Sequence, residues 1–298
     1  MTDKNTAYLS RALDYYKRVL HKESGNIYAA NGVAMVLAQS GRLVESKRIF
    51  AQLREAASGQ LGHVWTNLAH IHLHLKEYGP ATKLYQSALD RFHNGQNVPL
   101  MLCIAKSLWS AAVTIDKKEG NAIKVKDRRL LKQCKRTLQK ALHLSPRDYS
   151  IQFNLALVLK TGAEDMMRSV KDVHQAYLEA GEDVVATAPP FTKSDLEVVD
   201  NDNMIMRRLA GFLATIKDER EFPKGKRAEA EEFMTWGKDA SDILPEYINA
   251  VDEMRERYES PCTLDPKPCS HPEHETPNQV RELPFGDPAS GGHAPAGA

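Results

Sequence analysis

Apolar residues recur at three- and four-residue steps through most of the chain, which is the spacing of an amphipathic helix. They also recur at a second, longer interval. When residues 27–53 are set above residues 62–88, similar side chains coincide at an offset of 35 residues. The coinciding pairs are Ala34 and Ala69, Leu43 and Tyr78, Ser46 and Ala81, Phe50 and Tyr85, and Leu53 and Ala88. A fixed interval of this length indicates a repeat architecture.

Each repeat predicts two antiparallel helices. Small residues let the paired helices approach closely, and large residues fill the space between successive pairs. The small ones are Ala34, Ala69, Ala105 and Ala156, and the large ones are Tyr16, Phe50, Tyr85 and Leu138. Gly41 stands where the first helix of its unit must end, a position at which the backbone often turns left-handed.

One unit carries a pattern of residues that resembles the tetratricopeptide repeat (TPR). The pattern consists of Trp65, Asn67, Leu68, Ala69, Tyr78, Ala81, Tyr85 and Ala88. The interval is also close to the roughly 34 residues of that repeat. We therefore predict an all-α fold in which a TPR-type helical-hairpin solenoid is followed by non-repeat helices and a disordered tail.

The sequence predicts three segments. Residues 1–160 form the TPR array, with a basic insertion at about 112–130, and the repeat pattern stops near Lys160. Residues 161–260 form a helical C-terminal annex. Residues 261–298 hold eight prolines and four glycines with few large apolar residues, so they cannot offset the entropy of ordering and should be a disordered tail. The array opens within a second helix, so either a partner or further upstream chain should cover the apolar face of that helix.

The annex predicts four helices, at residues 163–180, 194–216, 227–238 and 246–258. A Pro189-Pro190 break precedes the second of them. Ser194 followed by Glu197 is typical of a capping box at its start. Pro245 is interpreted as part of the start of the last helix.

Composition restricts the class of protein. The chain has 40 Lys and Arg against 39 Asp and Glu, which leaves no global field to hold a polyanion. No apolar run is long enough to span a membrane, and the start lacks the apolar stretch of a signal peptide, so we expect no membrane partner. Four cysteines are too few for a disulfide scaffold of this size, which favours an intracellular protein.

Positive charge is concentrated between residues 117 and 140. The candidate basic patch consists of Lys124, Lys126, Arg128, Arg129, Lys132, Lys135 and Arg136. Such a run is typical of a nuclear-import signal, of a phosphate-contacting surface, or of a solvated helix face. No aromatic residues interleave with the bases, which argues against a platform for single-stranded nucleic acid.

Catalytic and metal-binding motifs are absent from the sequence. There is no Gly-rich phosphate loop, no nucleophile elbow, no His-Glu-x-x-His and no convincing strand pattern, so we predict that the chain is not an enzyme and holds no cofactor. Cys262, Cys269, His271 and His274 have ligand types that suit zinc, but their spacing departs from that of known sites. His70 and His74 are one helical turn apart, and we interpret them as groove residues rather than ligands.

The TPR resemblance implies that function lies in a concave groove lined by the first helix of each unit. The groove-lining positions select Tyr28, Asn31, Met35, His63, Thr66, His70, His74, Leu102, Lys106 and Trp109. This mixed polar and aromatic set suits a peptide held by shape and hydrogen bonds. It lacks the clamp of TPR co-chaperones, because Asn31 and Met35 occupy the positions of the first clamp Lys and Asn.

Several stretches resemble a more specific family, the large TPR scaffold subunits of the PAF complex, which associates with RNA polymerase II. These stretches are residues 14–20, 26–33, 49–56, 64–71 and 153–159, with a weaker likeness at 236–244. The basic insertion departs from the family, and the family's upstream repeats and long charged C-terminal region are missing.

This resemblance implies a nuclear, non-enzymatic scaffold. Its partners would be other PAF-complex subunits and, indirectly, RNA polymerase II, and it would support transcription elongation and coupled histone modification. Two alternatives remain open at this point. One is a general TPR adaptor that binds a peptide in another assembly, and the other is weak nucleic-acid contact through residues 117–140.

Overall fold

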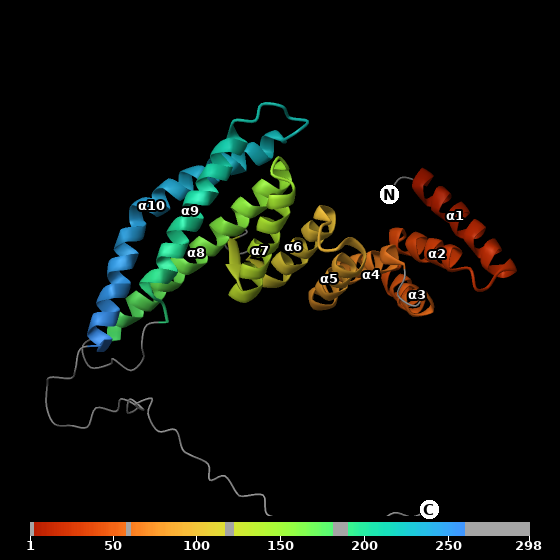
Figure 1. Cartoon of the computed structure of the whole chain (residues 1–298), viewed down its shortest axis with the longest axis horizontal. Coiled ribbons are helices and arrows are strands. Elements are labelled where there is room, and N and C mark those ends of the chain that lie inside the picture. The colour runs from red at the N-terminus through yellow and green to blue at the C-terminus, as the bar shows by residue number, and fades with distance from the viewer. Residues whose placement is uncertain (1–2, 58–60, 117–121, 181–189, 260–298) are drawn as a thin grey trace, which may run out of the picture.

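The computed structural model describes residues 3–57, 61–116, 122–180 and 190–259. These residues form ten helices and one two-stranded sheet in an elongated molecule (Figure 1). The elements are α1 (Asp3–Lys22), α2 (Ile27–Gln39), α3 (Leu43–Ala56), α4 (Gly62–His74), α5 (Tyr78–His93), α6 (Val98–Ala112), β1 (Val113–Asp116), β2 (Ala122–Val125), α7 (Arg128–Leu144), α8 (Tyr149–Ala180), α9 (Lys193–Ala214) and α10 (Lys224–Glu259). The predicted all-α solenoid with further helices is confirmed, whereas the tail at 261–298 and its Cys and His residues lie outside the described residues.

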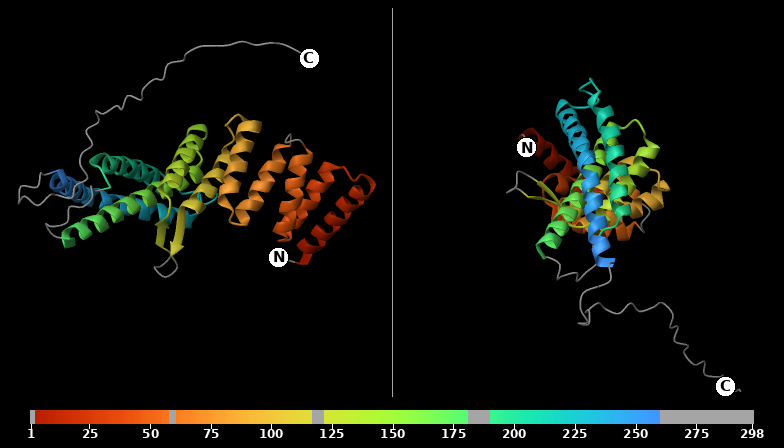
Figure 2. Two further views of the ribbon diagram at one scale, coloured as in Figure 1. Left: turned by 90° about the horizontal axis from the view of Figure 1, so that it is seen from below. Right: turned by 90° about the vertical axis from the view of Figure 1, so that its left-hand side faces the viewer.

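Helices α2 to α7 form three hairpins that stand side by side in a row (Figure 2). The small residues Ala34 and Ala69 are fully buried where paired helices meet. Phe50, Tyr85 and Leu138 are at most 1% exposed, as expected of side chains that fill the space between helices. Tyr16, predicted to do the same, is 37% exposed on α1. The core is therefore a continuous band that runs through the row.

The helices of the row begin and end at recognisable signals. Asn26 and Asn97 are N-caps whose side chains accept backbone hydrogen bonds from Ala29 and Leu100 at 2.9 and 3.0 Å. Asp127 caps α7 in the same way. Each cap satisfies backbone N–H groups that a helix start otherwise leaves without a partner.

The interval of 35 residues is also visible in the backbone. Gly41 follows α2 with φ of 80°, and Lys76, 35 residues later, follows α4 with φ of 61°. This left-handed conformation is easy for glycine and costly for a residue with a Cβ atom. Lys76 therefore holds a strained position that the equivalent unit fills with glycine.

The insertion after α6 contains strands that the sequence did not predict. β1 and β2 pair antiparallel with Val113 opposite Val125 and Ile115 opposite Ile123, and they project from one side of the row (Figure 2). The expectation of no strand pattern was wrong, because the alternation covers only four residues on each side of a charged stretch. The backbone N–H groups of Lys126 and Asp127 both donate to the carbonyl of Ala112, at 2.7 and 3.2 Å, and this closes the base of the hairpin.

Helix boundaries in the annex also differ from the prediction. One 32-residue helix, α8, replaces the two segments expected on either side of residue 160, and one 36-residue helix, α10, replaces the helices at 227–238 and 246–258. Pro245 lies inside α10, where it removes a backbone hydrogen bond. Burial of Leu244, Val251 and Met254 on both sides of it keeps the helix continuous. The start of α9 is capped by Thr192 and Asp195 rather than by Ser194 and Glu197.

The annex continues the core of the row. α8, α9 and α10 pack along one another (Figure 1), and the aromatic rings of Phe153, Phe222 and Phe233 meet at centroid distances of 5.5 and 6.0 Å. Buried Asn203 on α9 donates to the carbonyl of Gly237 and to the hydroxyl of Ser241, both at 2.8 Å. Because α8 belongs to both parts, the annex is fixed to the row by a continuous helix.

Substitutions at the two left-handed positions should have opposite effects. Gly41→Ala should destabilise the fold and Lys76→Gly should stabilise it, each by about 1 kcal/mol, because only glycine takes this backbone conformation without a Cβ clash. The surroundings of Gly41 are open, so the added methyl group tests the backbone alone. Denaturant titration followed by circular dichroism measures both changes, and shifts of the same sign would contradict the interpretation.

Candidate protein-binding groove

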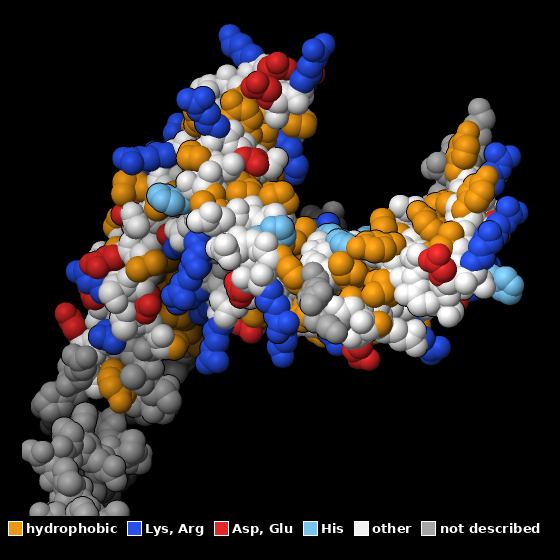
Figure 3. Space-filling model, turned by 45° about the vertical axis from the view of Figure 1, so that its right-hand side comes forward, with side chains coloured by type: hydrophobic (Ala, Val, Ile, Leu, Met, Phe, Trp, Pro, Cys, Tyr) orange, Lys and Arg blue, Asp and Glu red, His pale blue; other side chains and the backbone are white. Residues whose placement is uncertain are grey.

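The groove residues predicted from the sequence lie on α2, α4 and α6, the first helices of the three hairpins. Tyr28 is 70% exposed and Met35 is 41% exposed, although both are large and apolar. His63, His74 and Lys106 are exposed as well. The half-buried members are Asn31, Thr66, His70, Leu102 and Trp109. Histidine side chains and apolar side chains gather at the floor of the notch between the annex and the N-terminal helices (Figure 3).

Three of these residues line one cavity, which we name the α2–α4 hollow. It has a volume of about 540 Å³, and Met35, His70 and His74 lie on its walls. Asn67 lines it too. The sequence marked Asn67 only as part of the repeat pattern, although its three-residue spacing from His70 places both side chains on one face of α4.

Three others line a second cavity, the α6–α8 hollow. Leu102, Lys106 and Trp109 face this space of about 320 Å³ together with Leu138 of α7. Asn154 and Leu157 of α8 complete the wall. Asn154 and Leu157 are not among the predicted groove residues, because α8 lies at the end of the array, where the repeat pattern stops near Lys160.

The remaining four predicted residues line neither hollow. Tyr28 and His63 lie on the open surface. The amide nitrogen of Asn31 donates to the sulfur of Met35 at 3.8 Å, and the hydroxyl of Thr66 donates to the carbonyl of Gly62 at 3.3 Å. Asn31 and Thr66 therefore bond to groups of their own helices. The predicted groove consists of two hollows, and these four residues lie beside them.

His70 forms a hydrogen bond with a buried tyrosine. Its Nδ1 atom lies 2.5 Å from the hydroxyl of buried Tyr85. Burial raises the pKa of Tyr85 far above its usual range, so the hydroxyl keeps its proton, and it donates to or accepts from Nδ1 according to the tautomer of the ring. Burial, followed by the charges of His74 and Lys106, lowers the pKa of His70. The lowered pKa favours the neutral form of the ring.

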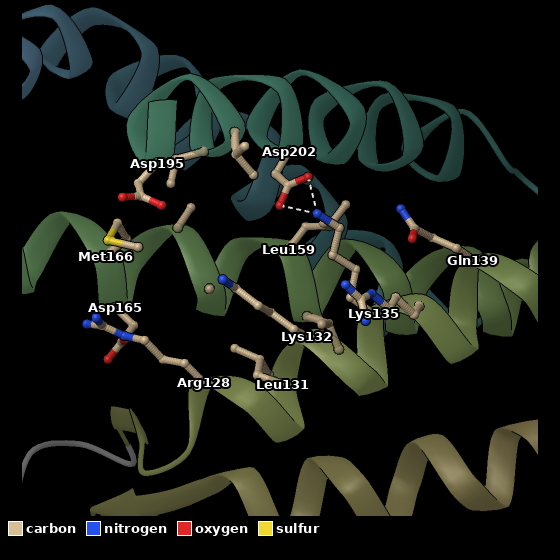
Figure 4. A pocket seen from close by; sticks show the side chains of 16 residues that line it. Arg128, Leu131, Lys132, Lys135, Gln139, Leu159, Asp165, Met166, Asp195 and Asp202 are labelled. Carbon is tan, nitrogen blue, oxygen red and sulfur yellow. Dashed lines mark hydrogen bonds and ion pairs between the residues drawn. The ribbon is translucent and has the colours of Figure 1, made fainter. Parts of the chain in front are cut away.

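The predicted basic patch meets acidic residues of the annex. Arg128 lies 2.6 Å from a carboxylate oxygen of Asp165 and also contacts Ser169. Lys135 lies 2.5 Å from both carboxylate oxygens of Asp202 (Figure 4). We name these two ion pairs the annex seam. They join α7 to α8 and α9, so Arg128 and Lys135 help to hold these helices together.

The annex seam borders a third cavity, of about 410 Å³, between α7, α8 and α9. Lys132 and Arg136 line it, and Asp195 lies across from Lys132 (Figure 4). The pKa of this carboxyl group is lowered by the Thr192 hydroxyl, which donates to it at 2.7 Å, then by the backbone N–H of Thr192, and then by the charge of Lys132. The other members of the patch lie outside the cavity: Lys124 on β2, Lys126 before α7, and Arg129 exposed on α7.

The described part of the chain has neither a metal-binding cluster nor a membrane-spanning helix. Among these residues, no three or more His, Cys, Asp or Glu side chains are grouped so that they could hold a metal ion. His70 and His74 belong to no such group. No helix among the same residues is long and apolar enough to cross a membrane.

Comparison with known proteins finds similar sequences in three organisms. The chain is 30% identical over 199 residues to Protein CTR9 homolog of Arabidopsis thaliana, a match that covers 64% of this chain and 17% of that protein. It is 28% identical over 177 residues to RNA polymerase-associated protein CTR9 of Caenorhabditis elegans, covering 59% and 14%. The chain is similar to CTR9 proteins. RNA polymerase-associated protein CTR9 of Saccharomyces cerevisiae is 30% identical over 166 residues, covering 53% and 14%.

These matches confirm the resemblance that the amino-acid sequences of the repeats predict. The chain spans less than a fifth of the length of these CTR9 relatives. No family model matches the chain. Among solved structures, MamA from Desulfovibrio magneticus RS-1 superposes with a TM-score of 0.42 at 15% identity, over 59% of this chain and 88% of that one. YrrB, a TPR protein, superposes with a TM-score of 0.40 at 13% identity, over 81% and 98%.

The lowered pKa of His70 predicts a loss of stability in acid. The unfolded chain takes up a proton at this residue near the ordinary pKa of 6.5, whereas the folded chain resists protonation. The unfolded state is therefore favoured as the pH falls below that value. Denaturant titrations from about pH 7.5 to about pH 5.5 should show a steeper loss for the wild type than for His70→Gln. Parallel pH profiles would contradict this assignment.

The annex seam predicts charge-reversal effects that compensate. Lys135 and Asp202 are only 24% and 17% exposed, so Lys135→Glu or Asp202→Lys alone should cost about 1–2 kcal/mol of unfolding free energy. The double variant should recover part of that loss, because it restores the pair with reversed signs. Lys140→Glu, an exposed charge reversal on the same helix, is the matched control and should change stability by about 0.5 kcal/mol or less. Denaturant titration measures all four variants, and a double variant no more stable than the worse single one would contradict the pairing.

Proposed function

We propose that this chain is a non-enzymatic protein-interaction scaffold of an RNA polymerase II-associated elongation complex of the PAF type. The observation that carries this proposal is the similarity to CTR9 proteins, two of which are named RNA polymerase-associated. The chain would act in the nucleus, hold other PAF-complex subunits, contact the polymerase indirectly, and so support elongation and coupled histone modification.

The geometry supports a role in binding. Large apolar side chains such as Tyr28 and Met35 are exposed on helices whose opposite faces are buried, and exposed apolar surface of this kind is typical of interaction sites. The α2–α4 hollow and the α6–α8 hollow follow one another along the row, so an extended segment of a partner would contact both. We propose the predicted groove residues as the binding surface, with Asn67, Asn154 and Leu157 added from the structure.

The two predicted helical segments would have different roles. We propose that the array at 1–160 binds partners and that the annex at 161–260 stiffens its C-terminal end through α8, which crosses residue 160 without a break. Nucleic-acid contact through the basic patch is the weaker alternative, because Arg128 and Lys135 already pair with carboxylates. A general TPR adaptor in another assembly would use the same groove.

Affinity purification tests the scaffold role. The tagged chain, incubated with nuclear extract before and after nuclease treatment, should recover elongation-complex subunits when the bound proteins are identified by mass spectrometry. The double variant Tyr28→Glu, Met35→Glu should lose about tenfold or more of that recovery, because it places charge on the apolar surface. Val44→Glu, an equally drastic change at a residue 57% exposed on α3, is the control and should recover subunits normally.

Three outcomes would count against the proposal. Recovery of chaperones alone would favour a general adaptor. Recovery that disappears after nuclease treatment would favour nucleic-acid contact. Equal recovery by the groove variant and the Val44→Glu control would remove the groove from the binding surface.

A further inference from the structure

The three helices that carry the groove contain no acidic residue. α2, α4 and α6 hold neither Asp nor Glu, although the whole chain has 39 of them. The helices behind them do carry carboxylates, such as Glu45 and Glu55 on α3 and Asp90 on α5. The side of the row that bears the hollows is therefore free of negative side chains from its own helices.

Two of these helices, α4 and α6, carry basic side chains. Lys106 is exposed at the α6–α8 hollow, and within the described residues it has no ion-pair partner. Its charge contributes to lowering the pKa of His70, after burial and the charge of His74. Half-buried His70 lines the α2–α4 hollow, and exposed His74 lies one turn farther along α4.

The α6–α8 hollow has an apolar interior with polar groups at its edge. Leu102, Trp109 and Leu157 line it, and the polar side chains of Lys106 and Asn154 are exposed beside it. Its volume of about 320 Å³ is at the small end of the range for ligand pockets, which is roughly 300–1,000 Å³. It suits one or two large apolar side chains rather than a folded element.

We propose that the groove takes an acidic peptide segment of a partner protein, with a large apolar side chain in the α6–α8 hollow and carboxylates facing Lys106 and the histidines of α4. This inference rests on the proposed function and deepens it. Complementary charge steers such a segment and rejects basic ones. A nucleic acid fits less well, because the groove offers a single Lys and no row of exposed aromatic rings for stacking.

Selection from a random library tests the chemistry of the partner. A phage-displayed library of random dodecapeptides is selected on the full immobilised chain. The selected peptides should be enriched in Asp and Glu and should carry one large apolar residue at a recurring position. Affinities of the synthesised peptides are then measured by fluorescence anisotropy, each beside a version in which Ser replaces the apolar residue.

The charge is tested with a matched pair of variants. Lys106→Glu should weaken binding of the selected peptides by about tenfold or more, and the Ser-containing peptides should lose a similar factor on the wild type. Lys83→Glu makes the same charge change at an exposed residue of α5 that lines neither hollow, and it should bind normally. Circular dichroism confirms that both variants are folded.

Several results would overturn the inference. They are a library that yields no binders, selected peptides that are neutral or basic, equal affinities for the Lys106→Glu and Lys83→Glu variants, or an oligothymidylate that binds as tightly as the peptides and depends on Lys106. Acidic binders without recovery of elongation subunits would instead defeat only the proposed assembly. Recovered subunits whose binding ignores Lys106→Glu would defeat only this inference.

Discussion

A helical hairpin of this kind cannot bury its own apolar faces, and the rest of the structure follows from that constraint. Phe50, Tyr85 and Leu138 are almost fully buried only because neighbouring helices cover them. Small residues such as Ala34 and Ala69 set the close approach within the row. Stacking leaves the opposite faces of α2, α4 and α6 partly open, so the same packing that stabilises the row also creates the two hollows.

The annex provides the cover at the C-terminal end of the row. α8 opens as the next helix of the array and continues as the first helix of the annex, so no flexible joint separates the two. The Phe153, Phe222 and Phe233 rings make the apolar part of this junction, and the annex seam adds ion pairs on its α7 side. Two residues of the basic patch, Arg128 and Lys135, thus form ion pairs within the fold instead of a free basic surface.

Much of the fold could be predicted because its signal is repeated. The offset of 35 residues identified the hairpins, and it even appears in the left-handed backbone of Gly41 and Lys76. Helix α10 was divided wrongly at Pro245, because buried Leu244, Val251 and Met254 keep the helix continuous on both sides of it. The β1–β2 hairpin was missed because two four-residue strands carry too little periodicity to stand out.

The candidate site was predictable only in part, for a related reason. Repeat positions named Met35, His70 and Trp109, because a regular array places equivalent residues on one side. The predicted positions do not include Asn154 and Leu157, which reach the groove from α8, where the repeat pattern stops. Pairing partners such as Tyr85 for His70 and Asp202 for Lys135 depend on three-dimensional neighbours that no local pattern specifies.

The closed base of the β1–β2 hairpin has a consequence for how this scaffold tolerates change. Two backbone hydrogen bonds to the Ala112 carbonyl bring the chain back to the point from which it left α6, so α7 docks as though nothing intervened. The number of residues between β1 and β2 therefore does not change how α7 packs against the other helices of the row. Such a position can accept a new sequence, a tag or a small domain while the surrounding helices keep their places.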